Sequence, residues 1–361
     1  MSVTAEARAE AARLIAHFQA AGAERVETDI LQPAETLLDL YGEDIRARAY
    51  VTSDPLRGEQ MLRPDFTVPL VLMHVARGGG GARYTYAGEV FRRQEVERDR
   101  PSEYLQVGYE SFAGDTPEAE DAEVFARIAE PLAPLGLRAA TGDIGVLRSA
   151  VEGLATTPAR KAALLRHLWR PRRFRALVDR FARPPAPSAP RARVLAAHDP
   201  LDGTPPWIGV RGPAEVRERV AALRDDAEAP PLAASEVALM DALLGVRETA
   251  PNALAALRDI AVDLRALTPA LDRLERRLEA LGARGFDPET LDFEASYGRT
   301  ALEYYDGFVF GLHAPARPDL PPVATGGRYD ALTRVLGRGR ALPAVGGAIR
   351  PEVALVLGGG R

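Results

Sequence analysis

The sequence has no cysteine among its 361 residues, which excludes disulfides, thiolate metal sites and cysteine nucleophiles. No apolar run approaches the length of about 18 residues that a membrane-spanning helix needs. Residues 1–14 lack the basic start and apolar core of a secretory leader. Together these absences predict a cytoplasmic protein.

Lysine is scarce beside arginine, and the formal net charge of −5 argues against broad, nonspecific binding of nucleic acid. A local basic patch remains compatible with that charge. The histidines show no metal-ligand spacing, and we expect them to be structural or at the surface, with no metal site and no cofactor. They are His17, His74, His167, His198 and His313.

Residues 84–112 are typical of two strands joined by an arginine-rich loop. Alternate residues of a strand share a face, so Gln106 and Glu110 flank Gly108 on one side of the second strand. On the first strand Gly88 lies on the equivalent face, which Arg92 continues into the loop. This surface could line a pocket for a small zwitterion or a nucleotide. The alternative is an ordinary antiparallel hairpin with an exposed basic turn.

The remaining pattern predicts an α+β protein. Strand signals occupy residues 1–154 and 286–361, whereas residues 155–285 are rich in helix signals and are interpreted as a helical insertion. Thr4 is expected to cap a helix ending near Ala21, and Asp143 another. A strand is expected at 25–31 and a helix at 34–42. Further helices are expected at 213–225, 234–246 and 251–281.

Five separated segments resemble, in order, blocks of the class II histidyl-tRNA synthetase catalytic core. They are LRPDFT (62–67), GEVFRRQ (88–94), EYLQVGYESFAG (103–114), LEYYDGFVF (302–310) and TGGRYDAL (325–332). The resemblance covers essentially residues 5–357. It implies an α+β fold in which helices flank an antiparallel sheet of the class II synthetase type.

Three departures from that family's pattern bear on catalysis. Gln94 replaces a glutamate that helps to hold ATP, Thr300 stands where the family has an arginine, and Val353 occupies the arginine position of motif 3. Electrostatic stabilisation usually dominates such chemistry, so a chain without these groups should adenylate poorly. The sequence also ends where the family's anticodon-binding domain would begin, and we expect no such domain.

A histidine site without these groups resembles the noncatalytic branch of the family, the ATP phosphoribosyltransferase regulatory subunits. This resemblance implies that the chain has no catalytic residues and forms a dimer within a hetero-octamer. Its partner would be a short catalytic subunit, which the chain activates and makes sensitive to histidine. The resemblance also implies a histidine site. Whether this site lies wholly within the chain or at the interface with the catalytic subunit stays open. The expected histidine-binding residues are Asp65, Thr67, Gln106, Glu110, Tyr304 and Tyr305. Arg92 is expected to be a further ligand contact. It is either a residue left from a nucleotide site or a partner for the carboxylate of the effector.

Two alternatives remain. One is a truncated histidyl-tRNA synthetase that still activates its amino acid. The other is a noncatalytic module that binds an amino acid or RNA, for which the basic helical pattern at 160–175 is the support. Because the net charge is negative, we do not expect the chain to bind tRNA.

Overall fold

The computed structural model describes residues 4–35, 48–94, 101–114, 116–202, 208, 210–299 and 304–359. Within these residues a large mixed sheet has the strand order β1-β5-β6-β12-β11-β10-β7-β9-β8. Its central pairs are antiparallel, whereas β1–β5 and β7–β9 are parallel. A small sheet has the order β2-β4-β3. The expected α+β, class II synthetase-like fold is confirmed.

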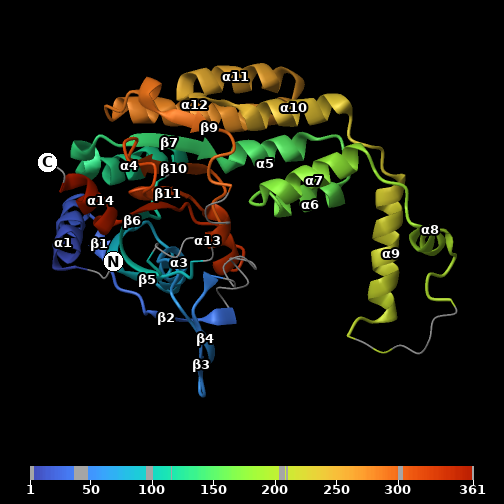
Figure 1. Cartoon of the computed structure of the whole chain (residues 1–361), viewed down its shortest axis with the longest axis horizontal. Coiled ribbons are helices and arrows are strands. Elements are labelled where there is room, and N and C mark those ends of the chain that lie inside the picture. Colours follow the sequence, from blue (N-terminus) through green and yellow to red (C-terminus); the bar gives the residue numbers. More distant parts are fainter. Residues whose placement is uncertain are drawn as a thin grey trace.

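The strands of the large sheet come from both ends of the chain and from its middle (Figure 1). They are β1 (Glu24–Arg25), β5 (Arg83–Phe91), β6 (Glu103–Ser111), β7 (Arg138–Asp143), β8 (Arg247–Thr249), β9 (Asp292–Glu294), β10 (Phe308–His313), β11 (Ala324–Arg328) and β12 (Val345–Ile349). The small sheet consists of β2 (Leu31–Pro33), β3 (Val51–Asp54) and β4 (Gly58–Leu62).

The helices of the first half are α1 (Ala5–Ala20), α3 (Thr67–Ala76), α4 (Pro117–Ala129), α5 (Ile144–Gly153), α6 (Pro158–Arg166) and α7 (Pro171–Ala182). Those that follow are α8 (Ala189–Ala196), α9 (Pro213–Glu228), α10 (Ala234–Gly245), α11 (Ala250–Asp263), α12 (Thr268–Ala283), α13 (Asp330–Leu336) and α14 (Pro351–Gly358). Short 3₁₀ turns are η1 (Glu130–Leu135), η2 (Arg265–Leu267) and η3 (Pro288–Thr290). None of the helices within the described residues is long and apolar enough to cross a bilayer.

The two faces of the large sheet have different neighbours. Helices α1, α4 and α14 contact β6, and on this side the ring of Phe18 lies 5.4 Å from that of Tyr109. Helix α12 packs on α4 in turn. Because successive strand residues point to opposite faces, this packing leaves Gln106 and Glu110 on the face away from α1. The polar half of β6 is thus available to line a site.

Within residues 155–285, the described part of the chain forms helices α6 to α12, the 3₁₀ turn η2 and the short strand β8. Figure 1 shows α8 and α9 extending away from the sheet, whereas α10, α11 and α12 lie beside one another above it. Strand β8 pairs with β9 and so joins this segment to the edge of the large sheet.

Local sequence signals set several element ends. Thr4 accepts a hydrogen bond from the Ala7 N–H at 3.1 Å, and Asp143 accepts one from Gly145 at 2.7 Å, so both expected helix caps are confirmed. The helix expected at 251–281 is instead two helices: α11 ends at Asp263, a 3₁₀ turn follows, and α12 begins at Thr268 with Pro269, which lacks an N–H, in its first turn. The helix expected at 34–42 falls largely outside the described residues.

The single strand expected at 25–31 is also wrong. Its two ends belong to different sheets: β1 ends at Arg25 beside β5, whereas Leu31 begins β2 beside β4. Between them the chain passes from one sheet to the other. The Val26 N–H donates to the Thr85 carbonyl of β5 at 2.9 Å, and the Ile30 carbonyl accepts from the Arg63 N–H at 2.8 Å. The Arg63 guanidinium donates to the Thr28 carbonyl in the middle of this stretch at 2.6 Å.

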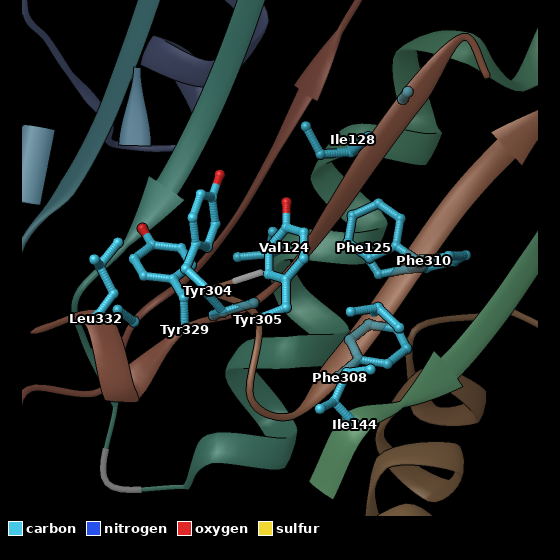
Figure 2. Packing of buried hydrophobic residues seen from close by; sticks show 14 of the residues in the cluster. Val124, Phe125, Ile128, Ile144, Tyr304, Tyr305, Phe308, Phe310, Tyr329 and Leu332 are labelled. Carbon is cyan, nitrogen blue, oxygen red and sulfur yellow. The ribbon is translucent and has the colours of Figure 1, made fainter. Parts of the chain in front are cut away.

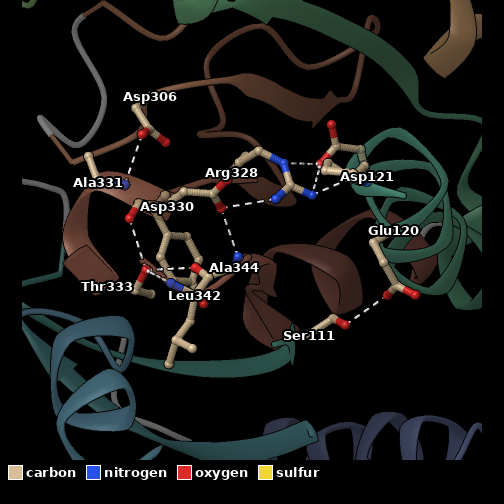
Figure 3. A network of polar contacts seen from close by, with 12 residues as sticks. Ser111, Glu120, Asp121, Asp306, Arg328, Asp330, Ala331, Thr333, Leu342 and Ala344 are labelled. Atoms are coloured by element: carbon tan, nitrogen blue, oxygen red, sulfur yellow. Dashed lines mark hydrogen bonds and ion pairs between the residues drawn. The ribbon is translucent and has the colours of Figure 1, made fainter. Parts of the chain in front are cut away.

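A buried network of ion pairs joins the helices to the sheet. Asp121 on α4 accepts from Arg277 on α12 and from Arg328 on β11, each at 2.8 Å. Arg277 also reaches Asp143 at 2.9 Å, and Arg328 reaches Asp330 at 2.9 Å. Figure 3 shows Arg328 between Asp121 and Asp330. This network fixes the position of Arg328 and hence of its neighbour in the chain, Tyr329.

Candidate functional site

The predicted hairpin exists as β5 and β6, with Tyr84 opposite Glu110 and Gly88 opposite Gln106. The two glycines on its polar face make room for other side chains. A Cβ at Gly108 would meet the Tyr86 ring at 2.1 Å, and one at Gly88 would meet the Arg63 guanidinium at 2.4 Å. The pocket interpretation of this face is therefore favoured over that of a plain hairpin.

A cavity of about 720 Å³ lies over this face. It is lined by all seven residues that the sequence singled out, although they come from four separate stretches of the chain. These residues are Asp65, Thr67, Arg92, Gln106, Glu110, Tyr304 and Tyr305. The structure thus brings the expected site residues together around one space.

Glu110 lies at the floor of this cavity, 2 % exposed. Three hydroxyl groups donate to its carboxylate: Tyr329 at 2.5 Å, Tyr86 at 3.2 Å and Thr67 at 3.3 Å. Burial raises the pKa of Glu110 to about 7, against the opposing effect of these hydrogen bonds. A carboxyl group with this pKa can exchange a proton with an imidazole, whose ordinary pKa is about 6.5.

Aromatic rings form the walls beside Glu110. Tyr304 and Tyr305 meet edge to face, with ring centroids 4.9 Å apart, and Tyr304 also lies 6.0 Å from Tyr329. In Figure 2 the three tyrosine rings lie close together, and Phe125, Phe308 and Phe310 lie to one side of them. Both members of the tyrosine pair line the cavity, so neither is only a core residue. Such rings offer flat apolar surfaces with hydroxyl tips.

Asp65 and Gln106 are also buried polar residues, 4 % and 5 % exposed. One Asp65 oxygen accepts the Thr67 N–H at 3.0 Å, which positions the carboxylate at the start of α3. The Arg92 side chain donates to the Pro64 carbonyl at 2.7 Å and so ties the end of β5 to the same loop. A second carboxylate beside Glu110 makes this part of the cavity suited to a cationic group.

Several lining residues were not anticipated. Tyr329 belongs to one of the five segments and Tyr86 to the first strand of the predicted hairpin, but neither was assigned to the site; Trp169 and Arg299 lie outside both. His313, expected to be structural or at the surface, also lines the cavity and is hydrogen-bonded to the Tyr297 hydroxyl at 3.0 Å. Burial lowers the pKa of His313, with nearby Arg350 acting in the same direction.

The three departures from the synthetase pattern have different positions. Gln94 is exposed and donates to the Pro101 carbonyl at 3.1 Å, at the base of the loop, and does not belong to the described cavity lining. Val353 lies in α14 and packs against the core. Thr300 falls outside the described residues.

The basic helical pattern at 160–175 is partly neutralised within the chain. Arg160 is buried and donates to Asp226 at 2.7 Å, and Arg175 is paired with Asp179 at 3.0 Å and with Asp241. These arginines stabilise contacts among α6, α7, α9 and α10. They provide less free positive charge for RNA than the sequence indicated.

The arrangement as a whole can hold a small zwitterion with a nitrogen-containing ring. Buried carboxylates at Glu110 and Asp65 can accept N–H groups, the tyrosines can cover a planar ring, and arginines on the same cavity can receive a carboxylate. Within the described residues no cluster of His, Asp and Glu is placed to hold a metal ion.

Comparisons with known proteins give a consistent result. Residues 3–199 and 215–353 match the family described as histidyl-tRNA synthetase. The chain is 32% identical over 353 residues to the ATP phosphoribosyltransferase regulatory subunit of Brucella anthropi, covering 91% of each chain. Against the protein of that name from Sinorhizobium medicae it is 31% identical over 362 residues, covering 92% of this chain and 93% of the relative.

Among solved structures, an ATP phosphoribosyltransferase regulatory subunit/histidyl-tRNA synthetase from Bacillus halodurans superposes with a TM-score of 0.68. The match covers 98% of this chain and 79% of the other, at 19% sequence identity. At that identity the likeness concerns the fold.

Proposed function

Since this chain belongs to the family of ATP phosphoribosyltransferase regulatory subunits, we propose that it binds a short catalytic subunit in the cytoplasm, activates it, and makes it sensitive to histidine. The catalytic reaction condenses ATP with phosphoribosyl pyrophosphate and releases pyrophosphate. The observation that carries the histidine part is the buried Glu110 carboxyl, surrounded by three hydroxyl groups on the cavity.

The cavity supplies partners for the imidazole ring and the ammonium group of histidine. The Glu110 carboxyl, with a pKa raised by burial to about 7, accepts or shares the imidazole proton. Asp65 and Gln106 receive the ammonium group, and Tyr304 and Tyr305 cover the ring. A cavity of about 720 Å³ exceeds the needs of one amino acid, so water or a second group shares it.

We infer that the chain carries out no catalytic step of its own. Gln94 lies at the base of the loop after β5, and Val353 brings no positive charge to α14. Phosphoanhydride chemistry depends on charged groups that hold and stabilise the phosphates. The resemblance places a carboxylate at the position of Gln94 and an arginine at that of Val353, and this chain has neither. The competing function, amino-acid activation by a truncated synthetase, requires histidine-dependent exchange of pyrophosphate into ATP.

The proposal is tested by mixing the purified chain with a short-form ATP phosphoribosyltransferase subunit and measuring pyrophosphate release. We expect a higher rate than with the catalytic subunit alone, and co-elution of the two chains. A rate that stays at the level of the catalytic subunit alone overturns the proposal. Histidine-dependent pyrophosphate exchange by the chain alone would favour the synthetase instead.

A further inference from the structure

Two buried hydrogen-bond donors on the cavity have no acceptor among the described residues. One is Nη2 of Arg299, a residue that is 4 % exposed, and the other is the indole N–H of Trp169. Both residues line the same cavity as Glu110. Buried donors are nearly always hydrogen-bonded, because a donor that is removed from water without a new acceptor loses its hydrogen bonds to water. Two such donors on one cavity indicate a place for an acceptor supplied from outside the chain.

The rest of Arg299 is held by the segment 155–285. Its Nε donates to the Leu168 carbonyl at 2.7 Å, and its guanidinium lies 4.9 Å from the centre of the Phe174 ring. Burial lowers the pKa of Arg299, and no carboxylate among the residues that the structure describes acts against that effect. A buried cation with this environment is stabilised by an anion, which a ligand can provide.

The other charged groups on this side of the cavity are already engaged. Glu294 is paired with Arg247 at 2.9 Å and accepts the Ser296 hydroxyl at 2.8 Å. Arg350 donates to the Pro322 carbonyl, and its guanidinium lies 5.8 Å from the Tyr104 ring centre. Arg299 and Trp169 therefore provide the open donors, and Arg350 adds positive charge to the same cavity.

We propose that Arg299 and Trp169 bind an oxyanion of the cavity's ligand and thereby make the helical segment 155–285 part of the effector site. Leu168 and Trp169 lie between α6 and α7, so an anion at this place joins the sheet side of the cavity to these helices. The proposal rests on histidine being the effector, whose carboxylate is the expected anion. A phosphate group of a nucleotide has the same chemistry and is the other source.

Trp169 itself offers the measurement, because the sequence contains only one other tryptophan, Trp207. In a Trp207→Phe background, the fluorescence of Trp169 is followed during titration with L-histidine, histamine, pyrophosphate and ATP. We expect saturable change with histidine. Histamine lacks the carboxylate and should bind at least about 10-fold more weakly, as loss of a charged hydrogen bond implies. Saturation by pyrophosphate or ATP in place of histidine would assign the anion site to phosphate.

Substitutions separate this proposal from the function proposed above. Arg299→Gln should weaken histidine binding by about 10-fold or more in calorimetry and leave histamine binding unchanged. Trp169→Phe keeps the ring and should weaken histidine binding by a few fold, about the effect of one neutral hydrogen bond. The control Arg317→Gln alters an exposed pair with Asp319 and should change neither affinity.

The outcomes are distinguishable. If histidine binds with unchanged affinity to both variants and leaves the fluorescence of Trp169 unchanged, the anion site is overturned while histidine binding stands. If histidine fails to bind the parent chain and the Trp169 signal responds to pyrophosphate through Arg299, the anion site holds and the histidine effector does not. If none of the four ligands binds the parent chain in calorimetry or changes the fluorescence of Trp169, both proposals are overturned.

Discussion

The hydroxyl of Tyr329 donates to Glu110 over 2.5 Å and links two residues that are 219 positions apart in the chain. Tyr329 follows β11 directly, and its neighbour Arg328 is held by Asp121 on α4. Tyr329 thus connects Glu110, which we propose to contact histidine, to the buried network of ion pairs between the sheet and the helices. A ligand that changes the Glu110 proton or its hydrogen bonds acts on that network.

Removing the Tyr329 hydroxyl should therefore affect both stability and binding. Tyr329→Phe deletes a hydrogen bond to a buried carboxyl group and should lower the free energy of unfolding by about 1–3 kcal/mol. Histidine binding should weaken as well, because Glu110 loses one of the groups that orient it. Urea unfolding and calorimetry measure the two effects. Tyr50→Phe, at a residue 38% exposed, should change neither.

Glu110 should impose a pH dependence on stability. Its pKa in the folded chain is raised by burial to about 7 from an ordinary 4.5, so folding favours the protonated form. That contribution is complete below the unfolded pKa and is lost as pH rises through the folded one. Between pH 4.5 and 8, wild type should lose about 3 kcal/mol relative to Glu110→Gln. A difference that stays constant over this range would show that Glu110 titrates normally.

Asp121 offers a test of the buried ion network. Asp121→Ala leaves Arg277 and Arg328 each with one fewer partner in a buried place, and should cost about 3–5 kcal/mol of unfolding free energy. Asp319→Ala breaks an exposed pair with Arg317 and should cost less than about 1 kcal/mol. Equal midpoints of thermal unfolding for the two variants would contradict the importance of the network.

A glycine on the neighbouring strand gives a steric test of the Glu110 position. A Cβ at Gly346 would lie 1.4 Å from Glu110 Oε2, so Gly346→Ala should displace the carboxylate and abolish histidine binding. Gly282 of α12 has open space around it, and Gly282→Ala should stabilise the helix by up to about 1 kcal/mol. Histidine affinity that survives the first substitution would place Glu110 outside the site.

Local features of the fold were predictable from sequence, because alternation and capping depend on neighbouring residues. The β5–β6 hairpin, the shared face of Gln106 and Glu110, and the Thr4 and Asp143 caps belong to this class. Features set by distant segments were not predictable. The strand expected at 25–31 is divided because its ends pair with strands of different sheets, and no local signal records that choice.

The residues of the site fall into the same two groups, those that the sequence predicted and those that depend on distant segments. The resemblance of short segments supplied Asp65, Thr67, Glu110 and the tyrosine pair, which the structure brings to one cavity. The position of Tyr329 beside Glu110 depends on the register between β6, β12 and β11, which is a tertiary property. Trp169 was missed because it lies in a helix-rich stretch where an aromatic residue indicates packing. Its role became visible only through its unbonded N–H.

Histidine inhibition of the reconstituted complex tests the central claim most directly. The chain is mixed with a short-form ATP phosphoribosyltransferase subunit, and pyrophosphate release is followed against histidine concentration for wild type and Glu110→Gln. We predict that both chains activate the catalytic subunit and that the variant complex requires at least about 10-fold more histidine than the wild-type complex for the same inhibition. Equal inhibition of the two complexes would contradict the assignment of histidine sensing to this cavity.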